Sequence, residues 1–480
     1  MSLLVIDVGT SGVRAAIVRP DASVEHVHHQ PVLPNSPEPG LVEFDAEAMA
    51  TAALEVADRA LHDGGPVDAV GIANQRSSTI VWDRRTGRPI GPGIGWQDLR
   101  TVGTCLVLQG SGLRVAPNAS ATKVAYLLGL VRREEWEHLL FGTVDTWIAW
   151  ALSGGELHLT DATNAGVTGL RAGDGRGWDP GILDALDIPA SLMPEVVDST
   201  GIVGLATALT GAPPISGIAG DQQASLIGQA CVRPGMAKIT FGTGGMLDAC
   251  VGPERPTFGT RGDGGCFPIV AWRQAGVSTW GVEAIMLAAG TNVEWLRDDL
   301  GIIATAAESD AVAAACADTG DVWYVPAILG LGTPYWDFGA RGALLGLTRG
   351  TGRPEIVRAV LEGVAHRGAD LVEAAETDAG TTFDVLRIDG GMSANRTFVQ
   401  AVANATGRPV DVAPVTEATT LGAAFLAGIA VGTWSGFDDA AAAYTPSASV
   451  EPTGTTDRAR WKEAVARARQ WYPDLSALDF

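Results

Sequence analysis

The sequence predicts an α/β protein of two duplicated domains, and three observations support this fold class. The 480 residues exceed what one ordinary core holds, and 46% of them are hydrophobic, so large cores can form. Apolar runs of strand length alternate with stretches of helical spacing. A strand, glycine turn and strand near the N-terminus, MSLLVIDVGTSGVRAAIV, recurs more than 200 residues later as GMAKITFGTGGMLDACV. A period of that length indicates a duplicated domain and not a solenoid.

In the first half, short apolar runs bounded by turn residues indicate strands, and they cover residues 3–8, 13–18, 67–73 and 79–82. A proline-rich loop follows the second run. Asp45 is then a suitable N-cap, because its carboxylate can accept a hydrogen bond from the first turn of a helix that ends near Leu61. Residues 101–152 have helical spacing, whereas residues 153–214 are punctuated by glycine and proline and indicate coil.

The second half repeats this alternation of strands and helices. Strands are expected over residues 215–219, 237–241 and 385–388, and helices over 221–229, 284–298 and 354–376, from about 395 onward, and over 457–471. The sequence has no low-complexity linker between the halves. We therefore expect two domains, 1–216 and 217–435, to meet over a cleft, with the tail 436–480 packing back as a helix.

The charge and cysteine patterns exclude several classes of protein. The 33 Lys and Arg against 55 Asp and Glu give a net charge of −22, which repels nucleic-acid backbones. The five cysteines lie far apart with no Cys-x-x-Cys pair, which argues against a disulfide framework or zinc ribbon and fits a reducing compartment. The N-terminus lacks a basic region, and the longest apolar stretch, 421–434, is too short to cross a membrane. We expect a cytoplasmic protein.

Two glycine turns have the composition of phosphate-binding loops. In the first, DVGTSG at 7–12, Asp7 ends a strand and the turn presents backbone N–H groups and the hydroxyls of Thr10 and Ser11. Such a turn binds anions, and a carboxylate at its edge can hold hydrated Mg²⁺. An ordinary β-hairpin gives the same pattern. The second turn, with Gly242 and Thr243, favours the functional interpretation, because a nucleotide clamped between two lobes needs one turn from each.

A third motif, DGGMSAN at 389–395, ends a strand with two glycines before a helix. Gly391 would let a flat ligand approach the backbone, and Asn395 would either cap the helix or contact an adenine edge. The chain has neither a G-x-x-x-x-G-K-[ST] loop nor the H-R-D and D-F-G motifs of protein kinases. Phosphoryl transfer would then depend on backbone amides, hydroxyls, Mg²⁺ and Arg14.

Taken together, these motifs resemble the FGGY-type carbohydrate kinases of the actin-like ATPase fold, and within them the glycerol kinase branch most. The resemblance runs from about residue 3 to residue 471 in ten ordered blocks. They are IDVGTSGVR (6–14), VGIANQRSSTIVWDRRTGRPI (70–90), GWQDLRT (95–101), SATK (120–123), FGTVDTWIAW (141–150), ISGIAGDQQASLIGQ (215–229), FGTGG (241–245), LGLGTPYWDFGARGALLGLTRG (329–350), IDGGMSANRTFVQ (388–400) and TTLGAAFLAGIAVG (419–432).

The resemblance implies two ribonuclease-H-like domains, each with a five-stranded sheet covered by helices on both faces. ATP and a small polyhydroxylated acceptor would bind in the central cleft, whose closure would exclude water. Asp7 would hold water-bound Mg²⁺, and Asp221 would be the catalytic base. The residues at ATP would be Thr10, Ser11, Arg14, Gly242, Thr243, Gly290, Gly391 and Asn395, and those at the acceptor would be Arg76, Trp96 and Gln222 beside Asp221.

Physical chemistry agrees with the role of Asp221. Phosphoryl transfer passes through a loose transition state, so the acceptor hydroxyl becomes acidic only late. A carboxylate of ordinary pKa within hydrogen-bond reach can then take the proton and orient the attacking oxygen. Asp221 follows a strand and starts a helix, so a simple N-cap is the alternative. Glu283 and Asp299, by contrast, are interpreted as helix-end charges.

The acceptor pocket departs from that of glycerol kinases at three positions. The resemblance places Ser77 where those enzymes carry glutamate, Asn118 where they carry tyrosine, and Met246 where they carry an aromatic residue. A roomier pocket without a hydroxyl-binding carboxylate should bind glycerol weakly. We therefore expect an ATP-dependent kinase for a polyol or sugar of four or five carbons, such as a tetritol.

Three alternatives stay open: a glycerol kinase proper, a kinase for ketopentoses such as xylulose or ribulose, and an actin-like ATPase used as a regulatory module. The spacing Trp96-x-Asp98-x-Arg100 resembles the ketopentose branch, whereas the blocks over 72–101 and Asp221 argue against the module. The expected partners are a small polyol or sugar and, in a homodimer, a second copy of the chain. Nucleic acid and membranes are not expected partners.

Overall fold

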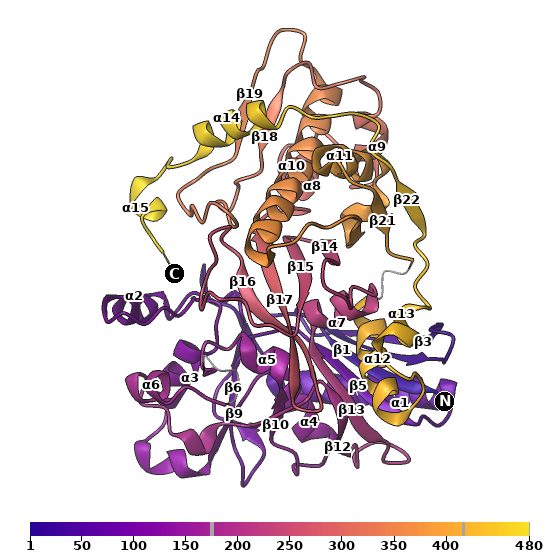
Figure 1. Ribbon diagram of the computed structural model, residues 1–480. Helices are drawn as coiled ribbons and strands as arrows, with labels where there is room; N and C mark the ends of the chain where they lie inside the picture. Colours follow the sequence, from indigo (N-terminus) through magenta and orange to yellow (C-terminus); the bar gives the residue numbers. More distant parts are fainter. Residues whose placement is uncertain (173–176, 415–417, 480) are drawn as a thin grey trace.

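The computed structural model describes residues 1–172, 177–414 and 418–479, which form an α/β protein of two lobes (Figure 1). A sheet of 13 strands runs through both lobes. In spatial order its strands are β22 (Ala448–Val450), β21 (Val410–Val412), β20 (Leu386–Asp389), β14 (Ala237–Phe241), β15 (Gly245–Gly252), β17 (Val277–Met286), β16 (Phe267–Gln274), β12 (Thr200–Leu205), β13 (Pro214–Gly220), β5 (Ala69–Asn74), β1 (Leu3–Val8), β2 (Gly12–Val18) and β3 (Val24–Pro31).

Short strands form four smaller sheets beside the large one. They pair β4 (Glu43–Phe44) with β8 (Gly93–Ile94), β10 (Leu159–Asp161) with β11 (Glu195–Val197), β18 (Trp323–Val325) with β19 (Ala343–Leu345), and β6 (Ile80–Asp83) with both β7 (Arg88–Pro89) and β9 (Leu139–Gly142).

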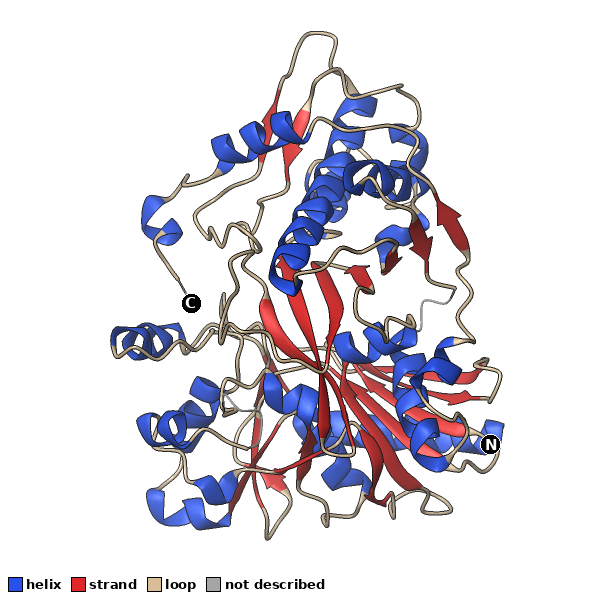
Figure 2. Cartoon of the chain, viewed as in Figure 1, coloured by secondary structure: helices blue, strands red, loops and turns tan. Residues whose placement is uncertain are grey.

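The longer helices lie around these sheets (Figure 2). The α-helices are α1 (Ala46–Gly64), α2 (Val102–Gly110), α3 (Ala121–Leu128), α4 (Val144–Leu152), α5 (Ala162–Gly166), α6 (Pro180–Ala185), α7 (Asp221–Gly228), α8 (Thr291–Glu294), α9 (Glu308–Ala313), α10 (Arg353–Ala379), α11 (Arg396–Thr406), α12 (Ala418–Val431), α13 (Phe437–Ala441), α14 (Arg458–Ala468) and α15 (Pro473–Ser476). Short helices of other types are η1 (Arg133–His138), η2 (Ala190–Leu192), η3 (Trp295–Asp299) and η4 (Gly391–Ala394).

The two halves of the large sheet are joined by very little strand pairing. In the first half, β3, β2, β1, β5 and β13 are consecutive neighbours, with β1 antiparallel to β2 and parallel to β5. The second half begins at β16, and its link to β12 is the single residue pair Thr200 and Gln274. One paired residue on each strand gives little backbone hydrogen bonding, so the halves are joined by few sheet contacts at this point.

Two helices cover opposite faces of the first-half sheet. Helix α1 packs against β1, β2 and β3, and it begins at the predicted cap, because Oδ1 of Asp45 accepts a hydrogen bond from Ala48 N at 2.9 Å. Helix α12 comes from the end of the sequence, yet it lies on β13, β5 and β1 (Figure 1). Glycines permit this close approach: a Cβ at Gly71 would lie 2.5 Å from Ala423 O, and one at Gly217 would lie 2.4 Å from Ala427 N.

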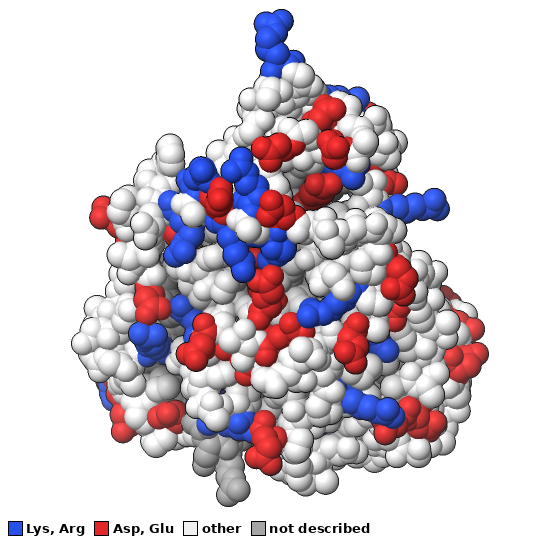
Figure 3. All heavy atoms as spheres, turned by 45° about the horizontal axis from the view of Figure 1, so that its top comes forward, with Lys and Arg blue, Asp and Glu red and all other residues white. Residues whose placement is uncertain are grey.

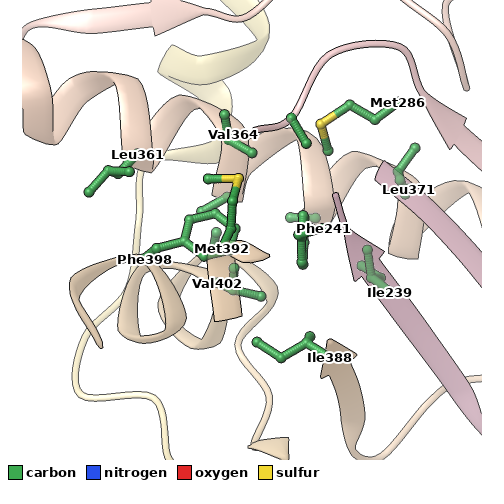
Figure 4. Packing of buried hydrophobic residues seen from close by; sticks show 14 of the residues in the cluster. Ile239, Phe241, Met286, Leu361, Val364, Leu371, Ile388, Met392, Phe398 and Val402 are labelled. Atoms are coloured by element: carbon green, nitrogen blue, oxygen red, sulfur yellow. The ribbon is translucent and has the colours of Figure 1, made fainter. Parts of the chain in front are cut away.

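The second half has its own hydrophobic core between α10, α11 and the strands (Figure 4). Phe241 at the end of β14 packs edge-to-face on Phe398 of α11, with ring centroids 4.9 Å apart and an interplanar angle of 86°. Aromatic pairs of this geometry add about 0.5–1.5 kcal/mol to the area that they bury. The end of β14, which carries the second glycine turn, is therefore held by a rigid core.

The C-terminal tail returns to the second half through α14. Trp461 is fully buried, and its Nε1 donates to Oδ1 of Asp370 at 3.1 Å, while Arg367 and Arg458 form ion pairs with the same carboxylate. Figure 3 shows basic side chains gathered on one part of the surface with acidic ones among them. Helix α14 is thus held by a buried tryptophan and a shared carboxylate, while β22 of the same tail joins the edge of the large sheet.

Most predicted elements are confirmed. After residue 18, however, the structure has strand β3 where only a proline-rich loop was predicted, and three further regions differ. The predicted helix over 284–298 is wrong at its start, because β17 continues to Met286 and helix begins only at Thr291. Val282, Ala284 and Met286 are buried at every second position, which is the period of a strand. In the sequence this pattern overlaps with helical spacing, so the start of the helix was misplaced. The segment 101–152 contains β9 as well as helices, and 153–214 contains β10, β11, β12, α5 and α6 where coil was predicted.

Among the described residues, no helix combines the length and the hydropathy needed to cross a membrane. All five cysteines carry free thiols, and four of them are buried.

Candidate active site

The first glycine turn connects β1 and β2 and is closed by a hydrogen bond from Gly9 N to Gly12 O at 2.9 Å. Asp7 lies on β1 directly opposite Arg14 on β2, so both predicted residues flank the turn. Ser11 is exposed at its tip, and Thr10 accepts a hydrogen bond from Trp96 Nε1 at 3.3 Å. The structure thus brings one predicted acceptor-site residue into contact with the predicted phosphate loop.

The second turn follows β14 and is held by the segment before α8. Ala289 N donates to Thr243 O and Gly290 N donates to Gly242 O, both at 2.8 Å. A Cβ at Gly290 would lie 2.7 Å from Gly242 O, so this packing requires glycine. Thr243 is exposed, and its hydroxyl and the turn's backbone can therefore be reached by an anion.

The third motif lies beside the second turn. Gly390 has φ of 87°, and a Cβ there would lie 2.4 Å from Phe241 O, so a larger residue would push the motif away from β14. Gly391 is exposed, and a Cβ on it would meet no described atom within 4 Å. This open backbone fits a flat ligand such as an adenosine group, and the two turns above offer donors to phosphates.

Asn395 makes the contacts of a helix cap. Its Oδ1 accepts a hydrogen bond from Phe398 N at 2.9 Å, and its Nδ2 donates to Ser309 Oγ at 2.9 Å. The first contact satisfies an otherwise unpaired backbone N–H in the first turn of α11. Contact between Asn395 and an adenine edge stays a prediction.

Arg76 and Asp221 face each other between the two halves. Arg76 follows β5, and its guanidinium forms ion pairs with Glu283 of β17 at 2.7 Å and with Asp221 at 3.5 Å. Its side chain is only 10% exposed. A lone arginine after a strand is usually a surface charge, whereas the structure makes Arg76 a buried link between Asp221 and Glu283.

Asp221 is the first residue of α7 and is not its cap. Gly220 occupies the N-cap position without a side-chain bond, and Oδ1 of Asp221 accepts a hydrogen bond from Gln222 N at 2.8 Å. Burial raises the pKa of Asp221, while the charges of Arg76 and Lys238 act in the opposite direction. The carboxylate keeps 32% of its side-chain surface exposed, so a hydroxyl can reach it.

Glu283 is not a helix-end charge, and that interpretation is wrong. It lies inside β17, is 5% exposed, and forms the shorter of the two ion pairs of Arg76. Burial raises the pKa of Glu283, and Arg76 opposes this rise. The sequence offers one usable signal, because Glu283 stands among the alternating apolar residues of a strand, where an unpaired charge would be costly.

The three positions that differ from glycerol kinases have distinct surroundings. Ser77 is 4% exposed with φ of 62°, and its Oγ donates to Val167 O at 3.1 Å. Asn118 is exposed, and Met246 is half-buried on β15 beside the second turn. Of these side chains, the amide of Asn118 is the polar group most accessible to a ligand.

Two buried lysines support the site and were not predicted to do so. Nζ of Lys123 donates to the backbone oxygens of Gly95, Trp96 and Asn118 at 2.9, 3.1 and 3.3 Å. Burial lowers the pKa of Lys123 to about 7. The other lysine, Lys238, donates to Gln222 Oε1 at 2.7 Å. Lys123 therefore ties together the two loops that carry Trp96 and Asn118, and Lys238 holds the residue next to Asp221.

Family models match nearly the whole chain. The N-terminal domain of the FGGY family of carbohydrate kinases matches residues 2–228, and the C-terminal domain of that family matches residues 238–431. The chain belongs to the FGGY family of carbohydrate kinases. Both the predicted family and the predicted actin-like ATPase fold are thereby confirmed.

Individual relatives of this FGGY chain agree with the family models. A glycerol kinase of Aromatoleum aromaticum is 42% identical over 494 residues, covering 98% of this chain and 99% of the relative. A glycerol kinase of Plasmodium falciparum, solved with ADP, has a TM-score of 0.90 at 27% identity and covers 97% of this chain and 98% of that structure. A xylulose kinase of Lactobacillus acidophilus shares the fold, with a TM-score of 0.83 at 20% identity. The match covers 99% of this chain and 96% of that structure.

The FGGY chain is therefore an ATP-dependent carbohydrate kinase that works with Mg²⁺. The residues present fit these groups: both glycine turns expose hydroxyls, and the backbone at Gly391 is open. Asp7 would hold the hydrated ion, with Thr10 and Thr243 near the phosphates. When bound, Mg²⁺ neutralises charge on the phosphate oxygens.

Replacing Asp7 by Ala is expected to lower kinase activity by about tenfold or more and to raise the Mg²⁺ concentration that activity requires. The reason is that Asp7 is the only carboxylate in the sequence of the first turn, 7–12. Initial rates measured over a Mg²⁺ titration check this, and higher Mg²⁺ should partly rescue the variant. Activity and titration curves equal to those of the unchanged enzyme would make Asp7 purely structural.

Proposed function

We propose that this kinase phosphorylates a hydroxyl of a polyol or sugar with four or five carbons, such as a tetritol. The observation that carries the proposal is the state of Ser77, which is buried and whose hydroxyl donates to Val167 O. At this position the resemblance to glycerol kinases predicts a glutamate that accepts hydrogen bonds from the substrate. With serine turned toward the backbone, glycerol loses that acceptor, and a site that loses designed hydrogen bonds discriminates strongly against the ligand.

The chemistry proposed for the site uses Asp221 as the base. Its carboxylate takes the proton from the acceptor hydroxyl while that oxygen forms a bond to the γ-phosphorus and the bond to ADP breaks. Arg76 lies within 3.5 Å of the Asp221 carboxylate and orients it. Trp96 is 40% exposed and offers a flat ring to the CH face of a polyol, and Asn118 can contact the far end of a longer chain.

The test is kcat/KM measured by ADP release with glycerol, erythritol, both threitols, pentitols and pentuloses as acceptors. We expect a four- or five-carbon acceptor to be best and glycerol to be poor. Asn118→Tyr should narrow the exposed end of the pocket and lower kcat/KM for the longer polyol more than for glycerol. Turnover that does not depend on any polyol would favour an ATPase regulatory module instead.

Glycerol kinase proper is the second candidate, and the 42% identity to an Aromatoleum glycerol kinase over nearly the full chain favours it. If glycerol has the highest kcat/KM by tenfold or more, which is about 1.4 kcal/mol of transition-state binding, the role given to Ser77 is wrong. If a pentulose has the highest kcat/KM, the ketopentose alternative is favoured.

We also propose a cytoplasmic location, a homodimeric state and the domain division at residue 216, none of which the acceptor assay addresses.

A further inference from the structure

A row of charged side chains crosses three neighbouring strands beside the predicted base. Lys238 of β14 lies directly opposite Asp248 of β15, and Asp248 lies directly opposite Glu283 of β17. All three are buried, and Lys238 and Asp248 are fully so. Because directly opposite residues share a face of the sheet, the row continues through Glu283 to Arg76, which in turn contacts Asp221.

Lys238 forms one ion pair within this row and two hydrogen bonds beside it. Its Nζ lies 2.8 Å from Oδ2 of Asp248, 2.7 Å from Oε1 of Gln222 and 2.9 Å from Oγ1 of Thr240. An ammonium has three protons and no lone pair, so it can only donate. A buried ammonium with three oxygen partners is therefore satisfied, and its position is well determined.

This donor also determines the orientation of the Gln222 amide. Since Lys238 can only donate, the side-chain oxygen of Gln222 must face it, and the NH₂ group must face the opposite way. Gln222 is half-buried, next to Asp221 in the first turn of α7. No hydrogen bond from its Nε2 to another described residue is present, so this donor is available to a ligand.

We propose that Lys238, held by Asp248, is a positioning residue of the acceptor site that fixes Gln222 as a hydrogen-bond donor to an acceptor oxygen. The inference rests on the proposed function, which places Gln222 at the acceptor. It adds that the pocket presents two donor side chains, Arg76 and Gln222, beside a single accepting carboxylate, Asp221. The acceptor must then carry an oxygen with a free lone pair next to the reacting hydroxyl.

The donor arrangement selects against a particular class of analogue. A hydroxyl or carbonyl oxygen accepts a hydrogen bond from the Gln222 amide, whereas the ammonium of an amino-deoxy polyol has no lone pair and would place a third positive charge near Arg76 and Lys238. Unpaired buried donors are expensive, so rejection of such an analogue should be strong. A glutamine free to rotate would accept from the ammonium through its oxygen and would discriminate less.

The first experiment removes the lysine without leaving a buried charge. Lys238→Met alone would leave Asp248 unpaired, so the variant to make is Lys238→Met with Asp248→Leu, in which both members of the pair become apolar. Lys462→Met is the matched control, since Lys462 is 61% exposed on α14 and pairs with Glu373 at 3.5 Å. Thermal unfolding shows whether each variant folds, and steady-state kinetics give KM for the acceptor and for ATP separately.

We expect the double variant to lower kcat/KM for the best acceptor at least tenfold, to leave KM for ATP unchanged, and to reject the amino-deoxy analogue less. In a Gln222→Ala background the same double change should cause no further loss, because the amide that Lys238 orients is gone. A merely structural role would not produce this non-additivity. Kinetics equal to the unchanged enzyme in a folded double variant would overturn the proposal.

A second variant keeps the proposal testable if the double variant does not fold. Gln222→Glu retains the oxygen that Lys238 binds but replaces the donating NH₂ by an acceptor, so kcat/KM for the acceptor should again fall at least tenfold. If Gln222→Glu matches the unchanged enzyme, Gln222 is not a donor and the inference is wrong. If Gln222→Ala has the kinetics of the unchanged enzyme, Gln222 does not belong to the acceptor site. If Gln222→Ala is impaired but the double variant is not, only the role of Lys238 is wrong.

Discussion

Replacing Asp221 by Asn is expected to keep the fold and ATP binding and to lower the rate of phosphoryl transfer by roughly 10²–10⁴. Asparagine is isosteric with aspartate but cannot take the proton of the acceptor hydroxyl. Arg76 would keep Glu283 as its partner at 2.7 Å, so no buried charge is left unpaired by the change. Single-turnover mixing of the enzyme–ATP complex with the acceptor measures the transfer step without product release.

The control for this variant is Asp58→Asn, which changes an exposed carboxylate on α1. It should transfer at the rate of the unchanged enzyme. ATP affinity, measured by fluorescence or calorimetry, should be alike in all three proteins. A near-normal single-turnover rate for Asp221→Asn would remove Asp221 as the base and leave it a helix-terminal residue.

Arg76→Met is expected to reduce both activity and stability. Removing the guanidinium leaves Glu283 and Asp221 without their shared positive partner, and breaking a buried ion pair from one side costs about 3–5 kcal/mol. The loss of an acceptor-site donor should lower kcat/KM by about 100-fold or more. Thermal unfolding at a fixed scan rate and steady-state kinetics measure the two effects.

Two further variants separate stability from catalysis. In Arg76→Met with Glu283→Leu the buried carboxylate is also removed, so stability should largely return while activity stays low. Arg85→Met removes an exposed guanidinium that pairs with Asp83, and a surface pair of this kind contributes about 1 kcal/mol or less. An unchanged unfolding temperature for Arg76→Met would show that the link between the halves does not stabilise the protein.

The glycine turns and their strands could be predicted because their signals are local. A glycine turn between two apolar runs can be recognised within about fifteen residues, and the N-cap Asp45 directly precedes its helix. The family followed from ordered blocks of such signals. The roles of individual ATP and acceptor residues stay predictions, since the structure gives their positions and the comparisons give the family.

The charge row could not be predicted from local pattern. Arg76 and Glu283 are far apart in sequence, and they meet only because β5 and β17 belong to opposite halves of one sheet. Lys238 and Asp248 are partners within the β14–β15 hairpin, but the step from Asp248 to Glu283 depends on the pairing of β15 with β17, which a single sequence does not reveal. Long-range pairing also explains the misread segment 153–214, whose short strands are stabilised by neighbours and not by their own composition.

The position of α12 has a consequence for the order in which the protein can fold during synthesis. The strands of the first sheet are complete when β13 leaves the ribosome, but the helix that covers one face of them begins only at Ala418. At about 5–20 residues per second, the intervening chain takes on the order of ten to forty seconds to make. For that time the glycine-lined face around Gly71 and Gly217 stays uncovered, and we expect the nascent chain to need protection from aggregation until α12 has been made.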